Sequence, residues 1–156
     1  MKKVFILPIL FLFVMMGCKK NFSDGSDNTW TLGSQRYFAS IVIRGTNSLS
    51  AFDTIAHQAI IFAFNSSPSG TENTYLICDT CSNQNTAQVI AEDYPITTSS
   101  HNNYRNAIYV NTLTLVKASI NAQGKLSVTF PGKLWVYNWA RANDSLQLSV
   151  GTIAQQ

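Results

Sequence analysis

Charged side chains are scarce in this sequence. Lys and Arg contribute 11 residues and Asp and Glu contribute 8, which together make up 12% of the 156 residues. Two of the lysines, Lys2 and Lys3, belong to an N-terminal leader, and without them nine basic and eight acidic side chains remain. A chain this close to neutral has no basic stripe that could neutralise the phosphates of a nucleic acid. We therefore expect no nucleic-acid partner.

Residues that commonly catalyse reactions or bind metals are also few. No serine lies in a GxSxG context, and neither a phosphate-binding loop nor a dinucleotide-binding glycine motif occurs. Asp53 and His57 lie four residues apart without a nucleophile beside them, and His101 lies in an Asn-rich stretch. Glu92 and Asp93 would point apart, unlike the facing carboxylates of a glycosidase. We expect no enzyme, no cofactor and no metal site, with a hydrolase as the third-ranked alternative.

Long helical patterns are missing as well. No segment keeps a 3.6-residue hydrophobic period over three turns, and no internal repeat is evident. Residues 59–64 form a continuous apolar run that predicts a buried strand, whereas residues 126–130 and 146–150 alternate apolar and polar side chains. Many short strands separated by turn residues favour an all-β fold. The prediction is a single antiparallel β-sandwich over residues 30–156, with barrel-like closure as a variant.

Turn residues divide this predicted domain. Gly33 and Ser34 separate residues 30–32 from residues 35–44, which predicts a hairpin in which the glycine supplies a positive φ. We expect residues 46–53 to form a loop or at most a helical turn. Residues 93–106, rich in Thr, Ser and Asn, are expected to be a long loop with short strand fragments.

The first eighteen residues have the organisation of a bacterial lipoprotein signal. Residues 4–16 form a nearly unbroken apolar run after the two lysines, and Gly17 precedes Cys18 as in a lipobox. Thirteen apolar residues at about 1.5 Å each are too short for the roughly 30 Å of a bilayer core, so a transmembrane helix is the weaker interpretation. We expect residues 1–17 to be a cleaved signal peptide, Cys18 to carry the lipid, and residues 18–29 to be a flexible tether. The protein would then be anchored to the outer membrane, facing the periplasm or the surface.

Cys78 and Cys81 form a CxxC pair. In an exported protein a local disulfide between them is expected, and the entropy model gives so small a loop roughly 2 kcal/mol. Two alternatives are weaker. A redox dithiol needs a helix N-terminus beside it, and a zinc site needs two further ligands at a suitable spacing.

Three aromatic side chains occupy alternate positions in residues 133–139. In a strand, Trp135, Tyr137 and Trp139 share one face, while Leu134 and Val136 share the other. Only one of these two apolar faces can point into the core.

Two interpretations of this strand remain open. If the alternation of residues 126–130 continues unbroken, the aromatic side chains point outward beside polar ones, as a surface for stacking on sugar rings would require. A bulge or a two-residue turn at Pro131-Gly132 would reverse the two faces. Because aromatic residues contribute strongly to cores, packing of the three rings in the core is the favoured interpretation.

The chain resembles small β-sandwich lipoproteins of Bacteroidetes-type bacteria, a group with no settled activity. The resemblance rests on Gly17-Cys18, Trp30-Thr31-Leu32, Phe130-Pro131-Gly132-Lys133-Leu134 and the terminal run from Leu146 to Gly151. It implies the fold and the envelope location, and it carries no activity with it.

The sequence thus predicts a non-catalytic, lipid-anchored binding or structural protein of the cell envelope. The more specific version of this prediction is a carbohydrate-binding domain that uses Trp135, Tyr137 and Trp139. The alternative is a protein that contacts another envelope protein through an exposed edge or loops and binds no small molecule.

Overall fold

The computed structural model describes residues 28–78, 83–93, 103–106, 114–130 and 132–156. Within these ranges the chain forms thirteen strands and no helix, which confirms the prediction of an all-β fold. The described ranges accordingly hold no helix that is long and apolar enough to cross a membrane. Cys18 and the predicted signal peptide lie outside the described residues, so the lipid anchor stays a prediction.

The strands are short and follow one another closely. In chain order they are β1 (Thr29–Leu32), β2 (Gln35–Phe38), β3 (Ile41–Arg44), β4 (Ser48–Asp53), β5 (Gln58–Phe64), β6 (Asn73–Ile77), β7 (Thr86–Asp93), β8 (Asn103–Asn106), β9 (Leu115–Ile120), β10 (Leu126–Thr129), β11 (Lys133–Asn138), β12 (Arg141–Val150) and β13 (Thr152–Ala154). Strand β1 begins one residue before the predicted domain boundary.

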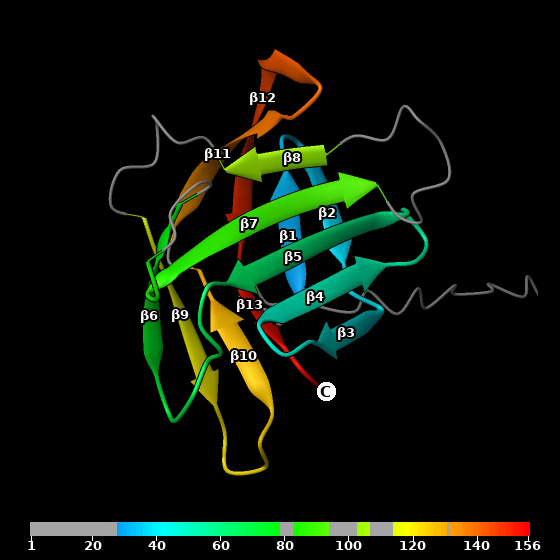
Figure 1. Cartoon of the computed structure of the whole chain (residues 1–156). Coiled ribbons are helices and arrows are strands. Elements are labelled where there is room, and N and C mark those ends of the chain that lie inside the picture. The colour runs from blue at the N-terminus through cyan, green and yellow to red at the C-terminus, as the bar shows by residue number, and fades with distance from the viewer. Residues whose placement is uncertain (1–27, 79–82, 94–102, 107–113, 131) are drawn as a thin grey trace, which may run out of the picture.

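Hydrogen bonds join these strands into one mostly antiparallel sheet that is not closed into a barrel. The main path runs β13-β10-β9-β6-β7-β8-β11-β12-β1-β2, and β5, β4 and β3 continue in that order from β7. The sheet is folded over, so that β4, β5 and β7 cross in front of β1, β2 and β13 (Figure 1). The fold therefore has the two layers of a β-sandwich, although the ladder between them is continuous.

Strand β7 is the branch point of this sheet. One of its edges pairs with β5 along seven residues, from Ala87 to Asp93. Its other edge pairs with β6 at the start of the strand and with β8 near its end. The β6–β7 contact is parallel, unlike the other pairs.

The core lies between the two layers. The side chains that fill it are almost completely buried, and they include Leu49, Ile60, Phe62 and Val89 from β4, β5 and β7, and Leu126, Leu134, Leu148 and Ile153 from β10 to β13. Burying each such side chain is worth roughly 1.5–3 kcal/mol relative to leaving it in water.

Turn chemistry and strand limits agree only in part with the predictions. The hairpin of β1 and β2 forms around Gly33-Ser34, and Gly33 has a φ of +61°. Residues 35–44, predicted as one arm, divide into β2 and β3. The expectation of a loop over residues 46–53 is wrong, because β4 pairs with both β3 and β5 there.

Candidate functional site

The side-chain alternation of β10 continues into β11. The inward-facing residues are buried, namely Leu126, Val128, Phe130, Leu134, Val136 and Asn138. Phe130 and Leu134 lie four positions apart, an even number, so the break between the strands leaves the two faces unchanged. Pro131 itself lies outside the described residues.

Trp135 and Tyr137 of β11, and Trp139 in the turn directly after β11, therefore face outward. Trp135 is 44% exposed and Trp139 is 59% exposed, whereas Tyr137 is half-buried. The favoured sequence interpretation, in which these rings pack in the core, is wrong. The alternative of an outward aromatic row describes their positions.

Arg105 of β8 extends this row. It lies opposite Tyr137 in the ladder, and its Cζ is 4.4 Å from the centroid of the Trp139 ring, a distance at which a guanidinium interacts with a π face. The rings of Tyr137 and Trp139 are 6.3 Å apart with an interplanar angle of 38°. We call Trp135, Tyr137, Trp139 and Arg105 the aromatic face.

Polar side chains surround the aromatic face. Gln147 of β12 lies opposite Trp135, and Ser145 lies opposite Tyr137. On the other side, Arg105 Nε donates a hydrogen bond to Asn103 Oδ1 at 3.2 Å, and Asn103 Nδ2 donates one to Glu92 Oε2 at 2.8 Å. Flat apolar rings thus lie next to amide, hydroxyl and carboxylate groups.

Sequence reasoning missed the contribution of β8. Asn103 and Arg105 lie within residues 93–106, which were predicted as a loop with strand fragments. Strand β8 has four residues, too few for an alternation of apolar side chains to stand out. Only the pairing of β8 with β11 brings Arg105 to Trp139, and such long-range pairing leaves no local signal.

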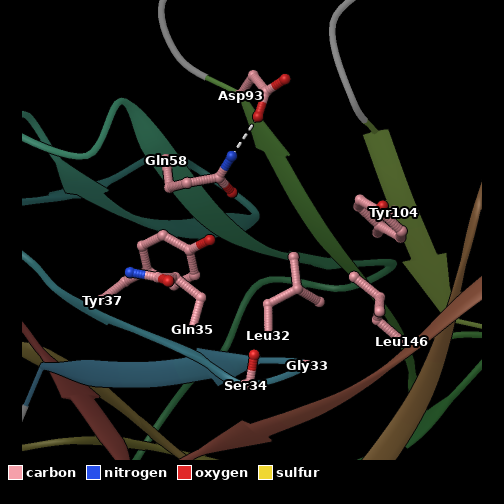
Figure 2. Close-up of a pocket in the computed structure, with 9 residues that line it drawn as sticks. All are labelled: Leu32, Gly33, Ser34, Gln35, Tyr37, Gln58, Asp93, Tyr104 and Leu146. Atoms are coloured by element: carbon pink, nitrogen blue, oxygen red, sulfur yellow. Dashed lines mark hydrogen bonds between the residues drawn. The ribbon is translucent and has the colours of Figure 1, made fainter.

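A second candidate site is a pocket of about 320 Å³ beside the β1–β2 hairpin (Figure 2). Its walls are formed by residues 32–35, Tyr37, Gln58, Asp93, Tyr104 and Leu146. These residues come from six different strands and the hairpin turn. None of the pocket residues was predicted as a site residue.

Gln58 and Asp93 meet across the β5–β7 ladder at the pocket. Gln58 Nε2 donates a hydrogen bond to Asp93 Oδ1 (Figure 2). Gln58 is 9% exposed, and its Oε1 is buried without a hydrogen-bond partner. In Figure 2 this oxygen points toward the space between Tyr37 and Leu32.

Two tyrosines provide the aromatic walls of the pocket. Tyr37 stacks on Trp30, with ring centroids 5.5 Å apart and an interplanar angle of 24°. Burial raises the pKa of Tyr37, and the carboxylates of Asp93 and Asp53 raise it further. Tyr104 donates a hydrogen bond to Asp144 Oδ2 at 3.1 Å, and burial is the main cause that raises its pKa. Both phenols therefore keep their protons at neutral pH.

The acidic residues weighed for catalysis have other roles. Asp53 accepts hydrogen bonds from the backbone N–H groups of Phe38, Ile55 and Ala56. Glu92 and Asp93 bond to different partners, as described above. Among the described residues, no three His, Cys, Asp or Glu side chains lie close enough to hold a metal ion. His101 lies outside the described ranges.

Cys78 ends the described part of the chain after β6, and it is disulfide-bonded. Its predicted partner, Cys81, lies outside the described residues. The Cys78–Cys81 pairing therefore stays a prediction.

Comparisons with protein-family models, with curated proteins and with solved structures find no match for this chain. The resemblance to Bacteroidetes-type lipoproteins therefore also stays a prediction.

Proposed function

We propose that this protein is a non-catalytic lipoprotein of the cell envelope that binds carbohydrate through the aromatic face. The observation that carries the proposal is the outward position of Trp135 in β11 and of Trp139 directly after it. Single exposed apolar side chains are common on protein surfaces, but contiguous apolar patches rimmed by polar groups are typical of binding sites.

The chemistry of the aromatic face suits sugar rings. The apolar C–H face of a pyranose packs against a flat aromatic ring, and its hydroxyls need hydrogen-bond partners of both kinds. Gln147, Ser145 and Asn103 offer such partners beside the rings. Four residues of extended chain separate Trp135 from Trp139, about 13 Å at most, which suits a chain of several sugars rather than a single ring.

Rigidity favours binding at this face. Strand β11 lies between β8 and β12 in the ladder, and Arg105 packs over the Trp139 ring. Because the rings are held by the ladder and by the guanidinium, less side-chain freedom is lost when a ligand binds.

Glycan-array screening of the full chain, followed by titration of each hit, tests the proposal. Trp135→Ala and Trp139→Ala should each weaken binding by about tenfold or more, since exposed tryptophans at binding sites often contribute more than about 1.4 kcal/mol. Leu115→Ala is the matched control, because Leu115 is as exposed as Trp135 but lies on β9. Equal affinity of all three variants for the glycan would contradict the proposal.

The lipid anchor is supported by the leader sequence. Intact-mass measurement of the protein extracted from membranes should show residues 1–17 removed and an acylated Cys18. An unmodified Met1 and a free Cys18 thiol would remove the anchor from the proposal and leave the glycan site unaffected.

A second candidate function is contact with another envelope protein through β3. Within the described residues β3 pairs only with β4, and its side chains include Ile41 at 48% and Ile43 at 54% exposure. An unpaired edge with apolar side chains is a place where a partner can add a strand.

A further inference from the structure

The pocket beside the β1–β2 hairpin contains a buried acceptor without a donor. Gln58 Oε1 has no hydrogen-bond partner, although the residue is 91% buried. The opposite orientation of the amide would turn this oxygen against the Asp93 carboxylate, where no donor exists, so the hydrogen bond to Asp93 fixes the amide. An unsatisfied buried acceptor destabilises the protein, and a ligand that supplies a donor would remove this cost.

Because this oxygen points toward the space between Tyr37 and Leu32, we infer that a ligand reaches it past Tyr37. The Tyr37 side chain is only half-buried and lines the same pocket, and rotamer changes of such side chains are fast. A donor that enters the pocket can therefore reach the Gln58 carboxamide together with the Asp93 carboxylate.

The pocket is lined by negative charge and not by positive charge. Among the described residues that line it, Asp93 is acidic and none is Lys or Arg. Behind the pocket wall, Asp144 accepts the hydrogen bond of Tyr104 and forms an exposed ion pair with Arg141 at 3.6 Å. The rings of Tyr37 and Tyr104 add two π faces, which attract cations.

We propose that this pocket binds the primary ammonium group of a small organic ligand. An ammonium group has three donors and no acceptor, so it matches a site whose principal groups are the Gln58 oxygen, the Asp93 carboxylate and two aromatic rings. The volume of about 320 Å³ is at the lower end of the range for ligand pockets, which limits the ligand to a small molecule or to the end of a longer one. The site is separate from the aromatic face.

The test compares n-butylammonium with 1-butanol, which has the same shape without the charge. Binding to the detergent-solubilised full chain is followed by saturation-transfer NMR and by titration. n-Butylammonium should bind at least about tenfold more tightly than 1-butanol, because a charged donor to a carboxylate is much stronger than a neutral one. No saturation transfer to n-butylammonium, or equal binding of the alcohol, would overturn the proposal without any need for a variant.

Two matched variants locate the binding. Asp93→Asn removes the charge and keeps an acceptor for Gln58, and it should weaken n-butylammonium binding by about tenfold. Glu92→Gln removes the same charge from the neighbouring residue, which bonds to Asn103 instead, and it should leave the affinity within about twofold. Equal losses in both variants would show a non-specific charge effect and refute the site.

The proposed binding sites at the pocket and at the aromatic face can be tested independently of each other. Trp139→Ala should leave n-butylammonium binding unchanged, and Asp93→Asn should leave glycan binding unchanged. Loss of both activities in either variant, with thermal unfolding as in the parent chain, would contradict the assignment of two independent sites.

Discussion

Asp53 shows how a single carboxylate stabilises a turn. It is 6% exposed, and it receives three backbone N–H donors where β4 leads into β5 and where β2 ends. Burial by itself raises the pKa of this carboxyl, but the three donors and the nearby His57 outweigh burial and hold the pKa below its ordinary value. The ionised form is thus the one that the fold stabilises.

Replacement of Asp53 by Asn should lower the free energy of unfolding at pH 7 by about 1.5–3 kcal/mol, the range for hydrogen bonds to a charged group. Because the folded pKa is depressed, this contribution is present above the unfolded pKa of about 3.9 and is lost as the pH falls through the folded pKa. Denaturant titrations of both proteins at several pH values should show the difference shrink on acidification.

Glu72→Gln provides the control for this experiment. Glu72 forms an exposed ion pair with Lys117 at 3.0 Å, and such pairs contribute about 0–1 kcal/mol. A loss in Glu72→Gln as large as in Asp53→Asn would show that carboxylate removal in general, and not the turn, is responsible.

At the scale of strands, a continuous apolar run or a regular alternation of apolar and polar side chains predicts the strand. Residues 59–64, 126–130 and 146–150 correspond to β5, β10 and β12 because their apolar side chains face a core that the strand pattern already implies. Strand β4 was not predicted, because Asp53 takes an inward position that usually belongs to an apolar residue. The pattern of β11 was visible, but its direction depends on the length of the connection before it.

The sites themselves were predictable only in part. The outward row on β11 could be proposed from its own residues, whereas Arg105 and the pocket groups Gln58 and Asp93 meet through pairings between distant strands. The register between strands that are distant in the sequence depends on how the whole core packs. The pattern of residues within one strand therefore does not predict which residues of another strand lie opposite it.

The proposed contact with an envelope protein through the exposed edge of β3 can be tested by substitution. Ile43→Lys should leave thermal stability within about 0.5 kcal/mol, as for most surface changes, and should abolish cross-links between β3 and any envelope partner in intact cells. Ile55→Lys is the matched control, because Ile55 is 88% exposed in the turn after β4. Cross-links that persist in Ile43→Lys would exclude partner binding at this edge.

For the molecule as a whole, the continuous ladder has a thermodynamic consequence. The two layers share one core and are joined through β7, so neither layer can lose its partner without exposing the same buried side chains. Unfolding should therefore be a single cooperative transition.

A variant with Trp135→Phe and Trp139→Phe tests this cooperativity. Trp30, which is 1% exposed in β1, then becomes the sole tryptophan of the chain, and its fluorescence reports on the core. Fluorescence and far-UV circular dichroism should give coincident denaturation curves. Separate midpoints would indicate that the layers unfold independently.

The even spacing between Phe130 and Leu134 also restricts how the gene can change. An insertion or deletion of one codon between β10 and β11 would exchange the solvent-exposed and core-facing sides of β11. The indole rings would then turn toward the core, and Leu134 and Val136 would be exposed to water. A change of two codons would keep both sides as they are. Natural length variation at this junction should therefore occur in steps of two residues.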